Sequence, residues 1–384
     1  MPGYEVIDKQ ELYQCEDILK KSKTFFRMGF EKKRNGIFKV LEFEKKFGSY
    51  FNAKYCLGVT SGTAALRVAL ASLNLKPNDE VITQAFTFVA TAEAIIEANC
   101  KPVCANIDDT LNLDPKDLIK KINKKTRAVI VVHMLGVPAR MREIVKICKK
   151  NKIILIEDTA WGCGGKINNK FLGTIGDIGT YSFDHAKAIT TGEGGMVVFK
   201  NKNHFLKGKA WHDHGHENNP KFPRWEDTRK SSGFNFRMNE LQGAIGIAQL
   251  KKLDFITKSQ RKNYYLILNS IKDIKGLKER SIPKNSYISA DALIIIVKNK
   301  KIAMRCRKFL LKSKISTKIL PEAYSWHFAG KWSHMKELNK KKNFKNSLKV
   351  SEKILSKAVS IPIFVKMTKN QISGIRNSLL KSLK

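Results

Sequence analysis

Largely apolar runs alternate with helix-like stretches along much of this chain, and that alternation restricts its fold more than any other property. The runs are DEVITQ, KPVCANI, RAVIVVHMLG and KIILIED, and the stretches between them are residues 88–98, 114–122 and 140–150. Buried strands separated by helices are typical of a parallel sheet that helices cover on both faces. The sequence therefore predicts an α/β fold with functional groups at the carboxyl ends of the strands.

Elements on either side extend this pattern. A strand over Tyr55 to Val59 leads into an Ala/Leu-rich helix, and another helix starts at Met238. Residues 255–384 contain more lysine and fewer glycines, with a strand-like ADALIIIVK, a helix, a strand over Ile315 to Leu320 and a final helix. We expect residues 1–254 to form a large domain and the remainder a smaller α+β domain.

The chain is strongly basic, since 72 Lys and Arg against 34 Asp and Glu among 384 residues give a formal charge of +38. Such a charge predicts attraction to anions. The lysines, however, lie in short clusters such as 120–125 and 340–342, and no aromatic-interleaved basic stripe or helix-turn-helix signature accompanies them. We therefore expect no nucleic acid among the main partners.

Targeting signals and cysteine usage favour a cytoplasmic protein. No apolar run approaches the roughly 18 residues of a spanning helix, and the opening MPGYEVIDKQELYQ lacks the pattern of a signal peptide. The seven cysteines include no C-x-x-C pair, which is typical of reduced core thiols. We expect a cytoplasmic location and no membrane insertion.

The stretch from Tyr181 to Gly195, YSFDHAKAITTGEGG, combines a strand end, one lysine and a glycine-rich turn. A cofactor with a carbonyl and a phosphate tail needs an amine such as Lys187 for a covalent bond. A hydroxyl such as Ser182, together with free backbone N–H groups, can hold the phosphate. Taken alone, the stretch is also compatible with a solvated surface lysine.

Two other places carry candidate groups. Residues 60–63, Thr-Ser-Gly-Thr, precede a helix, where free N–H groups and the helix dipole attract an anion; plain capping by Ser61 or Thr63 is the alternative. Asp158 directly follows an apolar strand. Its carboxylate can cap the next segment or pair with the protonated ring nitrogen of a cofactor.

A polar loop contains three alternating histidines, His212, His214 and His216. On a strand they would share one face and could chelate a metal. No nearby cysteine or further histidine completes a structural zinc set, so we expect no metal and favour a loop that contacts substrate or a partner.

Six motifs occur together in order: SGTAAL at 61, FTFVAT at 86, EDTA at 157, SFDHAK at 182, TTGEGG at 190 and GFNFRMNELQGAIG at 233. In this order and spacing they resemble the sugar aminotransferases of the DegT/StrS group, which are fold-type-I enzymes dependent on pyridoxal 5'-phosphate (PLP). The resemblance covers nearly the whole chain. It implies a large domain with a mostly parallel seven-stranded sheet and a smaller C-terminal α+β domain.

The resemblance also implies roles for individual residues. Lys187 resembles the Schiff-base lysine that later moves protons, and Asp158 resembles the partner of the pyridine nitrogen. Asn235 resembles an asparagine that reaches the phosphate of the neighbouring subunit's cofactor, which implies a homodimer with shared active sites. The remaining matches are the phosphate-binding group of Gly62, Thr63 and Ser182 and the ring-stacking aromatic Phe88.

Two positions bear on the reaction. Relatives that dehydrate a ketosugar replace the lysine with histidine, so Lys187 implies transamination, with glutamate as the expected amino donor. The family commonly has Gln or His three residues after the aspartate, whereas this chain has Trp161. The polar contact near the cofactor's phenolic oxygen is therefore not expected here.

The segments MPGYE, RNGIFKVLEFE, DHGHE and WHFAGKW resemble a subgroup that makes 8-amino-3,8-dideoxy-manno-octulosonate, an amino form of a lipopolysaccharide sugar acid. The implied substrate is the 8-oxo form, which we expect basic residues to line: Arg34, His214, His216 and His327. The alternative within the family is a nucleotide-linked 4-ketosugar aminotransferase of the perosamine type. From another class, an idle polyanion-binding relative is disfavoured by intact Lys187 and Asp158.

Overall fold

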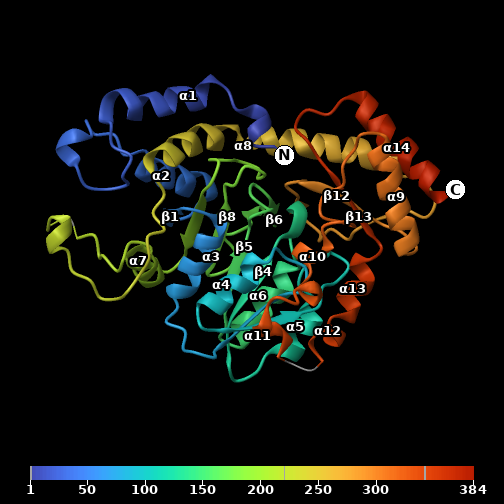
Figure 1. Ribbon diagram of the computed structural model, residues 1–384, viewed down its shortest axis with the longest axis horizontal. Helices are drawn as coiled ribbons and strands as arrows, with labels where there is room; N and C mark the ends of the chain where they lie inside the picture. The colour runs from blue at the N-terminus through green and yellow to red at the C-terminus, as the bar shows by residue number, and fades with distance from the viewer. Residues whose placement is uncertain (1, 220, 341–342) are drawn as a thin grey trace.

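The computed structural model describes residues 2–219, 221–340 and 343–384, and a seven-stranded sheet forms its centre (Figure 1). In spatial order the strands are β1 (Tyr55–Val59), β9 (Gly195–Phe199), β8 (Ile178–Ser182), β5 (Ile154–Asp158), β4 (Thr126–Val132), β2 (Glu80–Gln84) and β3 (Lys101–Ala105). Strand β9 pairs antiparallel with both of its neighbours, and the other pairings are parallel. The predicted mostly parallel sheet is confirmed.

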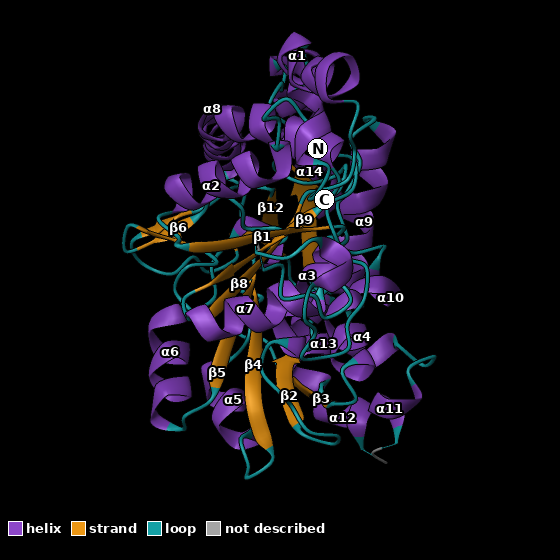
Figure 2. Ribbon diagram, turned by 90° about the vertical axis from the view of Figure 1, so that its left-hand side faces the viewer, coloured by secondary structure: helices purple, strands orange, loops and turns teal. Residues whose placement is uncertain are grey.

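Helices cover both faces of this sheet, as expected for strands that are apolar on both sides. Figure 2 shows α6 on one side of the strands and α4 on the other. One face packs against α3 (Gly62–Ala71), α4 (Ala90–Glu97) and α7 (Lys202–Trp211). The other face packs against α2 (Lys39–Phe51), α5 (Pro115–Lys121), α6 (Met141–Lys150) and α8 (Glu240–Ile271).

Local sequence explains where several of these helices begin. The Ser61 side chain accepts a hydrogen bond from Ala64 N–H at 3.0 Å and so caps α3. Asp114 caps α5, whose first residue is proline, and Asn239 opens α8 with a capping box. The capping interpretation of Ser61 is therefore correct, and it leaves the first N–H groups of α3 available to an anion.

A second, antiparallel sheet lies toward the C-terminus, in the orange and red part of Figure 1. It contains β10 (Lys278–Glu279), β12 (Ala292–Ile296) and β13 (Ala358–Pro362) and packs on α9 (Lys300–Lys312) and α14 (Lys369–Leu383). Helix α8 contributes Tyr264 and Ile267 to the same core. The expected domain boundary at 254/255 falls inside α8, so this single helix joins both sheets.

Shorter elements complete the described chain. Helix α1 (Lys9–Glu16) lies along α8, where Glu11 accepts hydrogen bonds from Gln249 and Lys252. A small sheet pairs β6 (Lys166–Ile167) with β7 (Lys170–Phe171) and β11 (Ser286–Tyr287). The C-terminal part also contains α10 (Tyr324–His327), α11 (Lys336–Asn339), α12 (Phe344–Ser347) and α13 (Lys349–Leu355).

One predicted strand is wrong. Residues Ile315 to Leu320 form no strand, because Ile319 adopts a positive φ of 70° that interrupts an extended run. Two backbone hydrogen bonds still tie the segment to Ser360 of β13, from Lys318 N–H and to Leu320 C=O. The strand that completes this sheet is β13, which the sequence did not reveal.

Within the described ranges, no helix combines the length and apolar character needed to cross a membrane.

Candidate functional site

A cavity of about 230 Å³ opens at the carboxyl ends of β5 and β8. Its wall combines the start of α3, the segment after β2, the residues after β5 and the turn that holds Lys187, and α10 adds one residue. Sequence-predicted residues that line it are Gly62, Thr63, Phe88, Asp158, Ser182, Lys187 and His327. The structure therefore brings together seven candidates that are spread over most of the chain.

Lys187 is buried in this cavity, and its Nζ lies 3.4 Å from the centroid of the Trp161 ring. Burial lowers the pKa of this amine to about 8, although the carboxylates of Asp184, Asp291 and Asp158 act in the opposite direction. A lysine with such a pKa is partly neutral near neutral pH. It can therefore act as a nucleophile and as a base.

Asp158 is the buried carboxylate of the same cavity. Its Oδ2 accepts a hydrogen bond from Thr91 Oγ1 at 3.2 Å, and its Oδ1 accepts one from Ala160 N–H at 3.1 Å. Burial raises the pKa of this carboxyl group, and the Ala160 N–H and the charge of Lys187 only partly oppose that effect. A cationic group placed against Asp158 would relieve the cost of burying its charge.

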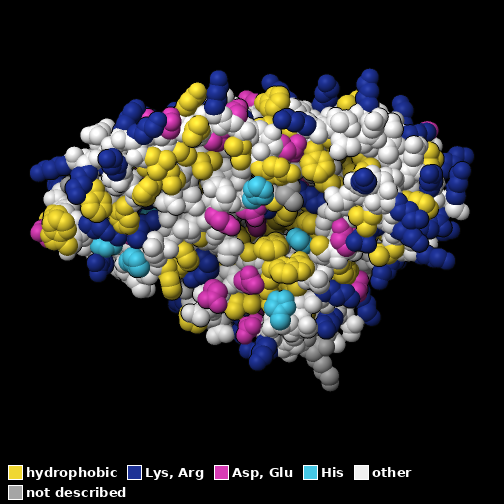
Figure 3. Space-filling view, turned by 45° about the horizontal axis from the view of Figure 1, so that its top comes forward, with side chains coloured by type: hydrophobic (Ala, Val, Ile, Leu, Met, Phe, Trp, Pro, Cys, Tyr) yellow, Lys and Arg dark blue, Asp and Glu magenta, His cyan; other side chains and the backbone are white. Residues whose placement is uncertain are grey.

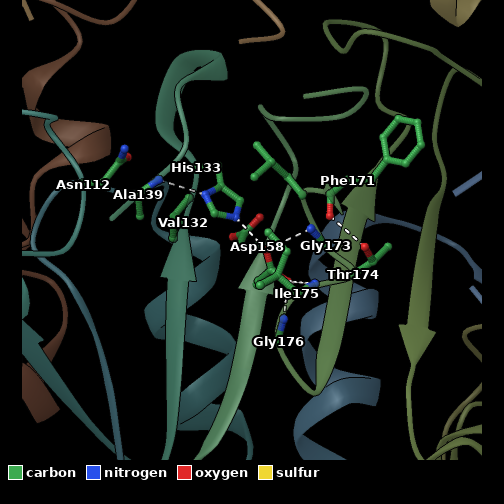
Figure 4. Close-up of polar contacts among 12 residues, drawn as sticks. Asn112, Val132, His133, Ala139, Asp158, Phe171, Gly173, Thr174, Ile175 and Gly176 are labelled. Atoms are coloured by element: carbon green, nitrogen blue, oxygen red, sulfur yellow. Dashed lines mark hydrogen bonds and ion pairs between the residues drawn. The ribbon is translucent and has the colours of Figure 1, made fainter. Parts of the chain in front are cut away.

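A pair of fully buried residues, His133 and Glu157, joins the carboxyl ends of β4 and β5 beside Asp158. Figure 4 labels His133 and Asp158. Ala139 N–H donates to His133 Nδ1 at 3.2 Å, so the ring proton lies on Nε2 and is donated to Glu157 Oε2 at 3.0 Å. The carboxylate of Glu157 also accepts from the N–H groups of residues 173, 175 and 176. Neither residue was predicted as part of the site, although both stand at the carboxyl ends of apolar strands.

The backbone at Gly62 passes close to Ser182. A Cβ atom on residue 62 would lie 2.7 Å from the Cβ of Ser182, so a larger residue would crowd this part of the wall. Ser182, Thr63 and Gly62, the first residue of α3, line the same cavity. A helix N-terminus with nearby hydroxyls attracts an anionic group such as a phosphate.

Aromatic rings form the remaining wall. The ring of Phe88 lies 5.5 Å from that of His327, and His327 lies 6.4 Å from that of Trp161. Burial lowers the pKa of His327 to about 4, despite the hydrogen bond between its Nδ1 and Ala323 C=O. His327 is therefore neutral at neutral pH, and this wall accepts a flat or apolar group.

These four features fit PLP. A buried amine suits its aldehyde, a buried carboxylate suits its protonated ring nitrogen, the start of α3 suits its phosphate, and the aromatic wall suits its ring.

Other predicted residues lie elsewhere in the chain. Asn235 lines a separate cavity of about 600 Å³ together with Arg27 and Arg237. Arg34 is fully buried, 3.2 Å from Glu240 Oε1, and donates to the C=O groups of Gly29 and Phe26. It therefore does not line the cavity of Lys187.

The three alternating histidines lie in a loop and not on a regular strand. His212 to His216 form a turn in which His214 has a positive φ of 53°, so the three rings do not share a strand face. His214 is exposed, and His216 Nδ1 lies 3.2 Å from Asp227 Oδ2. In the described ranges no group of three or more His, Cys, Asp or Glu side chains is arranged to hold a metal ion.

The expected excess of basic residues is not found at the cavity. Lys187 is the one Lys or Arg among its described lining residues, which also include the carboxylates of Asp158, Asp184 and Glu193. Figure 3 shows one face of the molecule, with Lys and Arg densest toward the margin and acidic and hydrophobic side chains nearer the centre.

Comparison with known proteins agrees with this geometry. The profile of the DegT/DnrJ/EryC1/StrS aminotransferase family matches residues 16–380. GDP-perosamine synthase of Vibrio cholerae is 35% identical over 232 residues, which are 57% of this chain and 59% of that enzyme.

Two solved structures share the fold at 26% identity and a TM-score of 0.85. One is a Helicobacter pylori aminotransferase involved in the biosynthesis of pseudoaminic acid, with 98% of this chain and 96% of that one covered. The other is GDP-4-keto-6-deoxymannose-3-dehydratase with a trapped PLP-glutamate geminal diamine, with 97% and 98% covered. The predicted fold type and cofactor are thereby confirmed, and the chain belongs to the DegT/DnrJ/EryC1/StrS aminotransferase family of PLP-dependent sugar aminotransferases.

Proposed function

We propose that this chain transfers the amino group of glutamate to the aldehyde of 3,8-dideoxy-8-oxo-manno-octulosonate, giving 8-amino-3,8-dideoxy-manno-octulosonate for lipopolysaccharide biosynthesis in the cytoplasm. The main support for a transamination reaction is that a buried amine, Lys187, and a buried carboxylate, Asp158, line the same cavity. The choice of acceptor rests on the resemblance of short segments such as WHFAGKW.

PLP, when bound, supplies an aldehyde that can exchange for an amine and a ring that withdraws electrons. In this proposal Lys187 Nζ takes a proton from the donor carbon and later returns one to the acceptor carbon. Its pKa of about 8 suits both directions, because neutral and charged forms are both populated near neutral pH. A histidine at position 187 would lack the primary amine, which is why the lysine favours transamination over dehydration.

Asp158 would hold a proton on the pyridine nitrogen. The hydrogen bonds from Thr91 and Ala160 fix its carboxylate. Gly62, Thr63 and Ser182 would hold the phosphate, and Phe88 would cover the ring and exclude water from it. Each of these roles belongs to one side chain or one glycine, so each can be tested by a single substitution.

We further propose that the active enzyme is a homodimer in which Asn235 reaches the cofactor phosphate of the neighbouring subunit. Its position supports this, because Asn235 lies in a cavity separate from that of Lys187 in its own chain. The activity of a mixture of two inactive variants, Lys187→Ala and Asn235→Ala, tests whether the two subunits share each active site. A mixed dimer contains one intact site, so about a quarter of wild-type activity should return. A mixture that stays inactive after subunit exchange would contradict a shared site.

The alternative acceptor is a nucleotide-linked 4-ketosugar, which the similarity to GDP-perosamine synthase favours. The deciding experiment offers both acceptors to the PLP-loaded enzyme with glutamate labelled at its nitrogen. Mass spectrometry then identifies the labelled amino sugar. Label in the octulosonate supports our choice, and label only in the nucleotide sugar replaces it.

A further inference from the structure

An exposed tryptophan stands at the edge of the cavity. Trp326 is 61% exposed, and the next residue, His327, lines the cavity wall. Leaving so large an apolar side chain in water brings no gain in stability. The exposed ring is therefore a candidate for contact with a ligand.

The segment that carries Trp326 is fixed against the cavity wall. Thr87 N–H donates to His327 C=O at 3.0 Å, and Ala329 N–H donates to Ala85 C=O at 2.9 Å. A β-bridge between Phe86 and Phe328 lies between these two bonds. The backbone of α10 is therefore tied to the segment after β2, which also carries Phe88.

Trp326 extends the aromatic wall outward. Its ring is parallel to that of Phe88 within 6°, with the centroids 6.4 Å apart, which is within the range of offset stacking. His327 and Trp161 continue the same wall toward Lys187. The aromatic surface is thus continuous from the amine to the mouth of the cavity.

The lining also contains polar groups. Asp184 and Glu193 contribute carboxylate groups to the same cavity. A sugar ring has an apolar face of C–H groups and a rim of hydroxyl groups. At the outer end of the aromatic wall, the exposed indole of Trp326 suits the C–H face of a sugar ring, and the carboxylates of Asp184 and Glu193 can accept hydrogen bonds from its hydroxyl groups.

We propose that Trp326 is a specificity-determining residue that binds the C–H face of the acceptor's sugar ring. This inference rests on the proposed function. In the 8-oxo octulosonate a short exocyclic chain separates the aldehyde carbon from the ring. When that carbon is near Lys187, the ring lies toward the mouth, where Trp326 stands. Glutamate has no such ring and does not need Trp326.

Measuring the two half-reactions separately distinguishes a role of Trp326 in acceptor binding from a purely structural role. The test uses the PLP-loaded enzyme and follows the visible absorption of the cofactor, first with glutamate and then with the octulosonate. The variants are Trp326→Ala and Trp326→Phe. The control is Phe255→Ala, because Phe255 is 58% exposed and lies on α8, outside the described cavity lining.

Trp326→Ala should leave the glutamate half-reaction unchanged and raise the acceptor concentration for half-maximal rate about five- to tenfold. Trp326→Phe should restore most of the loss, and Phe255→Ala should change neither half-reaction. Equal losses in both half-reactions, or an unchanged acceptor half-reaction, would overturn the proposal. A wild-type enzyme that does not react with glutamate would instead refute the proposed function.

Discussion

Lys187 Nζ lies 3.4 Å from the centroid of the Trp161 ring, and Lys318 Nζ lies 4.9 Å from the same centroid. One indole thus contacts two amines, at the position where related enzymes commonly have Gln or His. Lys318 is held by Asp291, whose Oδ1 lies 2.6 Å from its Nζ. An aromatic face stabilises the charged form of a nearby amine, while the like charge of Lys318 destabilises it.

This arrangement predicts opposite effects of two substitutions on the pKa of Lys187. Lys318→Met removes a positive charge and should raise that pKa, whereas Asp291→Asn removes a negative charge and should lower it. The rate at which the apoenzyme takes up PLP depends on the fraction of Lys187 that is neutral. The pH profile of this rate should therefore shift to higher pH in Lys318→Met and to lower pH in Asp291→Asn. Lys20→Met, which removes an exposed lysine paired with Glu16, should not move the profile. Shifts in the same direction would contradict this account.

Gly62→Ala should weaken PLP binding. The added methyl group would lie 2.7 Å from Ser182 Cβ and would push apart the groups proposed to hold the phosphate. Loss of one hydrogen bond to the charged phosphate should reduce the free energy of PLP binding by about 1.5–3 kcal/mol, which corresponds to a roughly 10- to 100-fold loss in affinity. Equilibrium titration of the apoenzyme with PLP measures this loss. Gly374→Ala, in the interior of α14, is the control and should bind PLP as the wild type does.

Glu157→Gln should destabilise the fold. Burial alone would raise the pKa of Glu157, but hydrogen bonds from His133, Gly176 and Gly173 outweigh it and hold the pKa below its ordinary value. Replacing this charged acceptor weakens its buried hydrogen bonds and should cost about 1.5–3 kcal/mol, which urea unfolding at pH 7 measures.

The pH dependence gives a second check on this pair. A carboxyl group whose pKa is lowered by folding adds stability above its unfolded pKa of about 4.3 and loses that contribution as the pH falls through the folded value. Glu157→Gln should therefore lose less stability than the wild type on acidification below about pH 4. Equal losses would show that Glu157 contributes nothing to the acid sensitivity. Glu352→Gln, at an exposed pair with Lys331, should behave as the wild type.

Asp158→Asn should slow the glutamate half-reaction without removing the cofactor's covalent attachment. An amide cannot stabilise a positive charge on the ring nitrogen, and loss of one such electrostatic contact typically costs about 10²–10³-fold in rate. The visible absorption of the bound cofactor should persist, and only its decay with glutamate should slow. A rate within twofold of the wild type would remove Asp158 from the mechanism.

The central sheet was predictable because its strands are short, buried and apolar, and the residues after β5 and β8 therefore fall at one edge. The motifs placed Lys187, Asp158 and Gly62 correctly in one cavity, since each stands directly beside a predicted strand or helix end. The pairing of His133 with Glu157 was not predictable, because it depends on the register between β4 and β5.

Side chains outside regular elements were harder to place. Arg34 looked like a substrate ligand, but its burial against Glu240 follows from tertiary packing that no local pattern records. The positive φ of Ile319 interrupts a segment that the sequence predicts as a strand. Sequence periodicity carries no information on such backbone reversals, since it reports which residues are apolar and not where the chain bends.

The most direct test of the account is the visible absorption of the PLP-loaded protein before and after glutamate is added, with Lys187→Ala measured in parallel. Transamination by Lys187 predicts a yellow protein whose visible band is lost on addition of glutamate, and no such band in the variant. A protein that stays colourless after PLP is supplied, or a band that glutamate leaves unchanged, would contradict the assignment of Lys187 and with it the proposed transamination.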